Sequence, residues 1–475
     1  MDPAEFRAHA HALVDWMADY LEHVAAYPVR SGSAPREILD RLPEHPPQSG
    51  EPFGDVFADF RNIILPGMTH WQSPNFYAYF PANSSPPSIL AEMLTATLGA
   101  QCMSWATSPA ATELEERMME WLREMLGLPD VFTGVIQDTA STATLCSLLT
   151  AREVRSGYAV NRTGFDPAMR FACYASREAH SSIEKGVKIA GIGRENLRLI
   201  PVDRNYAMVP EELERAILRD REAGRTPLWA VAAIGTTGST AVDPLRKIAE
   251  ICRRNGVWLH IDAAYAGTAL LLPEMRWMIE GIEMADSFVV NPHKWMLTNF
   301  DCTAYFVRDV AALLRTFAIL PEYLKTGEGE QVNNYRDWGI QLGRRFRALK
   351  LWFVVRDYGV SGLQKLVRHH LALAAAQKKR IEESGSFELL APVPLNALCF
   401  RYHPAGIDDP DTLNRLNAGL LERVNRTGKA FLTHTKLDGR FAIRMVLGQT
   451  TVTETNVRQT WDLLRDTAAT LDAGR

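Results

Sequence analysis

A lysine that directly follows an apolar run is the strongest chemical signal in the sequence. The segment SFVVNPHKW passes from small and apolar residues into Asn291, Pro292, His293 and Lys294. An ammonium group beside a buried strand must be desolvated or paired, and formation of a Schiff base is one use that accounts for such a residue. A solvated or ion-paired lysine is the alternative when this segment is taken alone.

Polar residues at other predicted strand ends supply what a cofactor bound to a lysine needs. Asp262 ends the run VWLHID and could pair with a protonated pyridine nitrogen, or cap the next turn. Thr139, Ala140 and Ser141 open a helix whose free N–H groups suit a phosphate, and they suit a helix cap equally well. His180 follows the run FACYAS and could stack on a planar ring, or be a capping or core histidine. Together these residues predict a cofactor site.

The elements that must position these residues form an alternating pattern. The runs FACYAS, LWAVAAIGTT, VWLHIDAAY, SFVV and CTAYFVR are separated by helical segments such as PEELERAILRDREAG and PLRKIAEICRRNG. Strands this apolar are typical of a largely parallel sheet covered on both faces, so the predicted fold class is α/β. Ligands of such sheets bind beyond the carboxyl ends of the strands, where Thr236 and Thr237 add hydroxyl groups.

The two ends of the chain differ from this pattern. Apolar residues from Phe6 to Val24 recur at helical spacing, and a Pro-rich stretch begins at Pro35, which indicates an N-terminal arm that needs a partner surface. Alternating runs on either side of Asp438 and Gly439 predict a hairpin. We therefore expect a helical arm over 1–85 that packs on a partner subunit, a cofactor domain over 86–360 and a small C-terminal domain over 361–475.

Composition restricts the class of protein. The chain has 475 residues, of which 47% are hydrophobic and 23% charged, as in ordinary globular proteins, and its net charge of −4 offers no general attraction for nucleic acid or anionic lipid. No apolar run approaches the roughly 20 residues that span a bilayer, and the polar N-terminus does not resemble a signal peptide, so we expect a cytoplasmic protein. The six cysteines lack metal-ligand spacing and are expected to be reduced and buried. Arg344, Arg345 and Arg347 are expected to pair with carboxylates.

Five longer motifs resemble the pyridoxal-phosphate group II decarboxylases, and most closely the branch that acts on aromatic L-amino acids. They are THWQSPNFYAYFP at 69–81, SWATSPAATELE at 104–115, WLHIDAAYAG at 258–267, NPHKW at 291–295 and LGRRFRALKLWF at 342–353. The resemblance covers nearly the whole chain and weakens after about residue 385. It implies the fold of type I pyridoxal-phosphate enzymes: an N-terminal helical arm, a large domain with a seven-stranded mostly parallel sheet, and a small α+β C-terminal domain. It also implies a homodimer with active sites at the subunit interface.

The resemblance assigns a role to each matching residue. Lys294 would carry pyridoxal 5'-phosphate as a Schiff base, Asp262 would face its pyridine nitrogen and His180 would stack on its ring. Tyr323, in a mobile loop, would protonate the product carbon with the assistance of His180, so Lys294, Asp262, His180 and Tyr323 are the expected catalytic residues. The other expected cofactor contacts are Thr139, Ala140, Ser141, Thr237, Ala264, Asn291 and His293. The expected substrate contacts are Trp71, Tyr79, Phe80, Pro81, Ala82, Gln101, Met103 and Gly343. No metal is expected.

The implied reaction is the decarboxylation of tryptophan, dopa, tyrosine or phenylalanine to an arylalkylamine and carbon dioxide. Relatives with Phe in place of Tyr323, or Asn in place of His180, resemble aromatic aldehyde synthases, which are the alternative on the same scaffold. This chain keeps both residues, so decarboxylation alone is preferred. A cofactor-binding regulator without catalysis is disfavoured, because the chain has the four residues Lys294, Asp262, His180 and Tyr323 together.

Several positions leave the substrate preference open. Gly343 matches a position where glycine makes room for indole or catechol rings, but it could equally allow close helix approach. The aromatic residues of the first motif could be plain core. Gln101 and Met103 stand where relatives often carry aliphatic and aromatic residues, and Ala82 replaces a hydroxyl residue. Asp138 stands where relatives usually have glycine, and it could weaken phosphate binding or cap the helix.

Overall fold

The computed structural model describes residues 1–319 and 331–473, which form two compact units. Unit 1 contains Met1–Pro81, Leu373–Leu390 and Leu398–Arg475, and unit 2 contains Ala82–Ala372 and Ala391–Ala397. Tyr323 lies outside the described residues. Within the part of the chain that the structure describes, no helix is both long enough and apolar enough to cross a bilayer.

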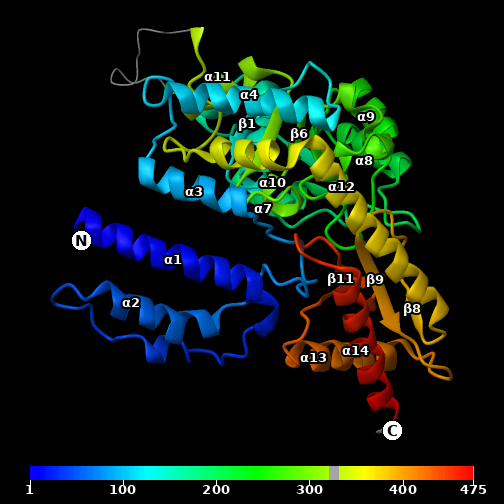
Figure 1. The fold of residues 1–475 in the computed structure, drawn as a ribbon. Coiled ribbons are helices and arrows are strands. Elements are labelled where there is room, and N and C mark those ends of the chain that lie inside the picture. Colours follow the sequence, from blue (N-terminus) through cyan, green and yellow to red (C-terminus); the bar gives the residue numbers. More distant parts are fainter. Residues whose placement is uncertain (320–330, 474–475) are drawn as a thin grey trace. The chain divides into compact units, whose positions relative to one another are not determined.

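Unit 2 is built on a seven-stranded sheet with the strand order β1-β7-β6-β5-β4-β2-β3. Figure 1 labels β1 and β6 of this sheet. The pairs from β6 through β5, β4 and β2 to β3 are parallel, whereas β7 is antiparallel to both β6 and β1. The strands are β1 (Thr133–Gln137), β2 (Phe171–Ser176), β3 (Leu197–Ile200), β4 (Thr226–Ala233), β5 (Trp258–Asp262), β6 (Ser287–Val290) and β7 (Thr303–Val307). The predicted α/β class and mostly parallel sheet are confirmed.

The five apolar runs of the sequence form β2, β4, β5, β6 and β7. The other two strands, β1 and β3, were not predicted. β3 is a four-residue edge strand whose side chains are mostly half-exposed or exposed, so it lacks the apolar run that marks a central strand.

Helices cover this sheet and bury its side chains. On one part of the sheet, Leu148 of α5 and Ile183 and Val187 of α7 pack with Cys173 of β2 and Trp229 of β4 in one buried cluster. On another part, α8 and α9 pack against each other (Figure 1). Both helices also pack against β4. The helices of unit 2 before residue 340 are α3 (Pro86–Leu98), α4 (Pro109–Leu126), α5 (Ala140–Ser156), α6 (Ala159–Thr163), α7 (Ser182–Ile189), α8 (Pro210–Glu222), α9 (Leu245–Arg254), α10 (Pro292–Trp295) and α11 (Val310–Phe317).

Unit 1 joins the first 81 residues to the C-terminal part of the chain. Tyr77 N–H donates to the carbonyl of Phe431, and Val29 N–H donates to the carbonyl of Gly428, both at 2.8 Å. Its four-stranded sheet has the order β10-β11-β9-β8. The helices α13 and α14 lie side by side (Figure 1). The elements are α1 (Pro3–His23), α2 (Phe53–Asp59), β8 (Phe387–Leu389), β9 (Ala397–Tyr402), α13 (Pro410–Arg426), β10 (Thr433–Leu437), β11 (Arg440–Val446) and α14 (Glu454–Ala473).

Local signals in the sequence explain several element ends. Asp2 caps α1 by accepting from the N–H of Glu5, whose side chain accepts from the N–H of Asp2 in return. The predicted hairpin is confirmed: Asp438 (φ 50°) and Gly439 (φ 79°) form the two-residue turn between β10 and β11. The helix α12 (Arg347–Glu383) runs from unit 2 into unit 1 and is kinked at Gly359, where φ is 62°.

Two further expectations about charged and sulfur-containing residues hold. Arg344 pairs with Glu115 at 2.6 Å, Arg347 pairs with Asp301 at 2.8 Å, and Arg345 pairs with Glu92. These arginines therefore belong to the structure of unit 2 and not to a polyanion site. All six cysteines are buried and free of disulfides.

Candidate active site

Several predicted site residues meet at one edge of the seven-stranded sheet. Because β2, β4, β5 and β6 are parallel, the residues that follow them leave the sheet at the same edge. Asp262 ends β5 between Ala233 of β4 and Val289 of β6, Lys294 follows β6 in α10, and His180 follows β2. The topology thus gathers an amine, a carboxylate and an imidazole from three separate strands.

The turn that carries Lys294 is held tightly. Asn291 N–H donates to the carbonyl of Ala264 at 2.9 Å, which joins the exit of β6 to the exit of β5. Asn83 Nδ2 donates to the carbonyl of Lys294 at 3.0 Å. The next residue, Trp295, is fully buried and stacks on Tyr265 with 4.9 Å between ring centroids. The Lys294 side chain, itself half-buried, therefore projects from a rigid support.

The charges of Asp262 and Lys294 both act on the pKa of His180. Partial burial of its ring lowers the pKa of His180 below the ordinary value, the Asp262 carboxylate opposes that shift, and the Lys294 ammonium adds to it. Nδ1 of His180 accepts a hydrogen bond from the N–H of Ser182 at 3.2 Å, so the ring proton of the neutral form lies on Nε2. Asp262 Oδ1 accepts from the N–H of Ala264 at 3.1 Å, which orients the carboxylate. The imidazole is therefore neutral beside a lysine and an oriented carboxylate.

Two buried polar residues flank the lysine in the same turn. Nδ1 of His293 accepts from the N–H of Cys302 at 2.9 Å, and burial, with the nearby Lys294 charge, lowers the pKa of His293 to about 3. Its ring is therefore neutral, with the proton on Nε2. Asn291 Oδ1 accepts from the hydroxyl of Thr303 at 3.0 Å. Among residues 1–319 and 331–473, neither Nε2 of His293 nor Nδ2 of Asn291 has a hydrogen-bond acceptor.

The N-terminus of α5 lies after β1 and supplies unpaired donors. Thr139 is the N-cap, and its side chain accepts from the N–H of Thr142. Within the described residues, the N–H groups of Ala140 and Ser141 have no hydrogen-bond acceptor. In a 17-residue helix these two groups stand at the positive end of the dipole, an arrangement that suits a phosphate.

The two threonines in the turn after β4, Thr236 and Thr237, have different surroundings. Thr236 is buried, and its hydroxyl oxygen accepts from the N–H of Ala241 at 3.1 Å, so it stabilises the turn itself. Thr237 is exposed, and its hydroxyl group has no hydrogen-bond partner within the described part of the chain. Of the two hydroxyl groups expected at this edge, the structure therefore leaves that of Thr237 for a ligand.

Pyridoxal phosphate, the cofactor implied by the motifs, fits these residues. It requires an amine for covalent attachment, a carboxylate for the ring nitrogen and N–H donors for the phosphate. Lys294, Asp262, Ala140 and Ser141 provide these groups from elements of one unit.

The predicted substrate contacts fall into two sets. In unit 2, Gln101 Oε1 accepts from the N–H of Arg344 at 2.8 Å, and a Cβ on Gly343 would lie 3.3 Å from Gln101 Nε2. The carbonyl of Met103 accepts from the N–H of Arg336 at 2.9 Å. The structure therefore brings Gln101, Met103 and the segment with Gly343 together, while Ala82 lies half-buried in the same unit.

The aromatic set belongs to unit 1. Trp71 packs on Phe76 at 4.4 Å and stacks on Tyr79 at 5.8 Å between centroids. The guanidinium of Arg444 lies over the ring of Phe80 at 4.5 Å. Phe76 is fully buried, whereas Trp71 and Tyr79 are exposed. The last member of this set, Pro81, is buried. Trp71 and Tyr79 are thus surface aromatic residues of this unit and not part of its core.

Sequence patterns did not predict some residues that support the site. Asn83 stands in the segment PANSSPPS, and Thr303 begins an apolar run, so neither has a local signal beyond being polar. Both are completely buried, and their partners are Lys294, 211 residues away, and Asn291, 12 residues away. A buried polar side chain needs a partner, but the sequence does not say which one.

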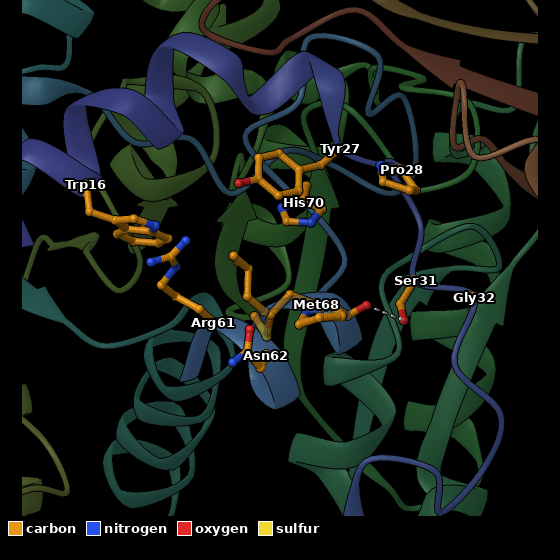
Figure 2. A pocket seen from close by; sticks show the side chains of 11 residues that line it. Trp16, Tyr27, Pro28, Ser31, Gly32, Arg61, Asn62, Met68 and His70 are labelled. Carbon is orange, nitrogen blue, oxygen red and sulfur yellow. Dashed lines mark hydrogen bonds between the residues drawn. The ribbon is translucent and has the colours of Figure 1, made fainter. Parts of the chain in front are cut away.

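A separate pocket lies in unit 1, between α1 and the segment before His70 (Figure 2). It has a volume of about 390 Å³, and Trp16, Tyr27, Arg61 and His70 are among the residues that line it. None of its described lining residues is a lysine, aspartate or glutamate. It therefore lacks the amine and the carboxylate that the candidate site provides.

Comparison with known proteins agrees with this geometry. The family model described as "Pyridoxal-dependent decarboxylase conserved domain" matches residues 35–403. Tyrosine decarboxylase 2 of Narcissus pseudonarcissus is 43% identical over 100% of this chain and 96% of the relative, and phenylacetaldehyde synthase of Arabidopsis thaliana is 42% identical over 99% and 97%. A crystal structure of Oryza sativa TDC with PLP and tryptamine superposes with a TM-score of 0.96 and 36% identity over 99% of each chain. The expectations of a pyridoxal-phosphate cofactor and a carboxy-lyase are confirmed, and the chain belongs to the pyridoxal-dependent decarboxylase family.

Proposed function

We propose that this protein decarboxylates aromatic L-amino acids of the tryptophan, dopa, tyrosine and phenylalanine class to arylalkylamines and carbon dioxide. The observation that carries the proposal is the gathering of Lys294, Asp262 and His180 at the sheet edge beside the N-terminus of α5. The substrate class is supported by the names of relatives, which include tyrosine and tryptophan decarboxylases. Tryptamine, which is bound together with PLP in the Oryza sativa structure, is an arylalkylamine.

Each residue has a defined task in this reaction. Bound pyridoxal phosphate supplies an electron sink for the electron pair that the departing carboxylate leaves on Cα. Lys294 would hold the cofactor through its amine, Asp262 would hold a proton on the pyridine nitrogen, and Ala140 and Ser141 would bind the phosphate through their N–H groups. Thr139, Thr237, Ala264, Asn291 and His293 are the further proposed cofactor contacts.

Two residues would act on the planar ring and on Cα. The neutral imidazole of His180 would stack on the ring. Tyr323 would deliver the proton that replaces the carboxylate on Cα. The overall change is balanced, because one carboxylate leaves as carbon dioxide and one proton takes its place.

Aromatic aldehyde synthesis is the second candidate, and the relative named phenylacetaldehyde synthase favours it. That reaction also consumes oxygen and water, and it releases ammonia and hydrogen peroxide. The presence of Tyr323 and His180 favours simple decarboxylation.

We further propose a cytoplasmic homodimer with the active sites at the subunit interface. An apolar stripe on α3 supports the dimer: Leu90, Leu94 and Leu98 recur at four-residue spacing and are 53%, 46% and 66% exposed. A second copy of the chain would remove this stripe from water. The proposed substrate contacts in that dimer are Trp71, Tyr79, Phe80, Pro81, Ala82, Gln101, Met103 and Gly343. The division of the chain into a helical arm over 1–85, a cofactor domain over 86–360 and a C-terminal domain over 361–475 stays a prediction.

The test is turnover by the purified protein loaded with pyridoxal phosphate. Tryptophan, dopa, tyrosine, phenylalanine, histidine and glutamate are supplied separately, and amine, aldehyde and peroxide are measured together. Amine from an aromatic substrate without peroxide supports the proposal, and aldehyde with peroxide moves the protein to the synthases. No turnover of any aromatic substrate refutes it.

A lysine variant links turnover to the site. Lys294→Ala should lose the absorbance of the lysine-bound cofactor and at least about a thousandfold in kcat. Lys247→Ala, which changes an exposed lysine of α9, is the matched control and should keep both.

A further inference from the structure

Asp138, the residue before the N-cap of α5, is held through both carboxylate oxygens. Oδ1 accepts from the N–H of Thr139 at 2.5 Å, and Oδ2 accepts from Nε2 of Gln341 at 2.6 Å. Burial raises the pKa of the Asp138 carboxyl group, but hydrogen bonds from Thr142, Thr139 and Gln341 outweigh burial and leave that pKa below its ordinary value. Asp138 is therefore ionised at neutral pH, and both hydrogen bonds are charge-assisted.

Gln341 lies in the segment 338–344, whose first end packs on the end of β1. Gln137 Nε2 donates to the carbonyl of Trp338 at 3.1 Å. A Cβ on Gly339 would come within 2.7 Å of the same nitrogen, so a larger residue at position 339 would displace the Gln137 amide. The link between Asp138 and Gln341 follows directly, in the middle of the segment.

The second end of segment 338–344 is held by Arg344. Its N–H donates to Gln101 Oε1 at 2.8 Å, and its guanidinium pairs with the buried carboxylate of Glu115 at 2.6 Å. Gly343 therefore stands between two anchors, the Arg344 contacts on one side and the Asp138 carboxylate on the other.

We propose that Asp138, acting through Gln341, is a positioning residue that fixes segment 338–344, and with it Gly343, against the N-terminus of α5. The inference rests on the proposed function, in which α5 binds the cofactor phosphate and Gly343 contacts the substrate ring. Asp138 directly precedes the proposed phosphate-binding turn, and its carboxylate accepts from Gln341 in segment 338–344. This hydrogen bond therefore joins the turn rigidly to the segment that would contact the substrate. A glycine at position 138 has no side chain with which to make this link.

Hydrogen exchange tests the positioning without any substrate. Asp138→Gly and Gln341→Ala should each raise the exchange rate of the Trp338 and Arg344 amides about tenfold, in the protein with and without pyridoxal phosphate. Asp138→Asn should exchange as slowly as the wild type. Its amide oxygen can still accept from the N–H of Thr139, and its amide N–H₂ can donate to the side-chain oxygen of Gln341 once that amide has rotated.

Kinetics tests the consequence for the substrate. Asp138→Gly and Gln341→Ala should raise KM for the preferred aromatic amino acid about tenfold and change kcat less than about threefold, since a looser Gly343 weakens binding more than chemistry. Asp138→Asn should again stay near the wild type. Gln364→Ala removes a glutamine donor bond of 2.8 Å, to the carbonyl of Leu271, elsewhere in unit 2 and should alter neither KM nor exchange of segment 338–344.

The outcomes separate this inference from the proposed function. Amine production by the wild type tests the function alone, and the ratios of variant to wild type test only the positioning. Unchanged exchange in Asp138→Gly and Gln341→Ala overturns the inference. So does faster exchange with unchanged KM, because the segment would then be loosened without consequence for the substrate.

Discussion

Among single residues, Tyr323, the proposed proton donor to Cα, decides between the two candidate products, amine and aldehyde. We expect Tyr323→Phe to lower the rate of amine formation about a hundredfold, because the phenolic proton is removed, and to release aldehyde, ammonia and peroxide when oxygen is present. The measurement follows amine and peroxide together, in air and under nitrogen.

The control for this prediction is Tyr158→Phe. Its ring lies 3.8 Å from the guanidinium of Arg315, and a phenylalanine keeps that contact. Amine as the sole product of Tyr323→Phe in air contradicts the role assigned to Tyr323.

The buried residue His260 should make the free energy of unfolding depend on pH. It is fully buried in β5 beside Trp229, with Nδ1 2.9 Å from the hydroxyl oxygen of Ser287, and burial lowers the pKa of its imidazole to about 4. The unfolded state binds a proton near pH 6.5 and the folded state only near pH 4, so folding stability is lost as pH falls through this window. From pH 7 to pH 5 the contribution of His260 to this loss should be about 2 kcal/mol.

The comparison with a variant isolates this contribution. Urea unfolding of the wild type and His260→Gln at pH 7 and pH 5 should show a loss about 2 kcal/mol smaller for the variant. An equal loss in both proteins means that His260 is not the titrating group.

At the element scale, one glycine sets how closely the exits of β5 and β6 approach. A Cβ on Gly267 would come within 2.7 Å of Cγ2 of Val290 and 3.2 Å of Cβ of Ala263. These residues border the turns that carry Asp262 and Lys294. A substitution must therefore push the two turns apart.

We expect Gly267→Ala to lower the free energy of unfolding by about 1–3 kcal/mol and to lower kcat, because overpacking displaces the turns of the active site. Gly186→Ala in α7 is the control, since its Cβ would meet only Leu148 at 4.0 Å. There alanine should leave activity unchanged and add up to about 1 kcal/mol of stability through helix propensity. Thermal unfolding and turnover measure both effects.

For the whole molecule, the exposed leucine stripe of α3, formed by Leu90, Leu94 and Leu98, predicts that two copies of the chain form a dimer. Leu94→Asp places a charge in the middle of this stripe and should raise the dimer dissociation constant at least a hundredfold, that is by about 3 kcal/mol. It should lower activity in parallel, because the proposed sites lie at the interface. Light scattering over a range of concentrations measures the state of assembly.

The matched control is Leu218→Asp on α8, where the leucine is 45% exposed. It should leave assembly and turnover unchanged. A monomeric and active wild type contradicts the proposed dimer.

Local patterns in the sequence were enough to predict part of the fold and part of the candidate site. Apolar runs predicted five strands of the sheet, and the polar residues after them marked Asp262, His180 and Lys294 as the chemistry-bearing positions. Asp438 and Gly439 predicted the C-terminal hairpin. Local prediction succeeds here because side-chain periodicity and turn residues are set by neighbours in the chain.

Contacts between residues that are far apart in the chain could not be predicted from local patterns and come from the folded structure. β7 enters the sheet antiparallel between β6 and β1, and this placement sets the Thr303 hydroxyl against Asn291 and the carbonyl of Asp138. Gln341 reaches Asp138 across 203 residues. Burial made His260 and His293 neutral, and no local pattern announces that change in pKa. The physical reason is that strand order and desolvation arise from packing of the whole core, whereas a sequence window records only the preferences of adjacent residues.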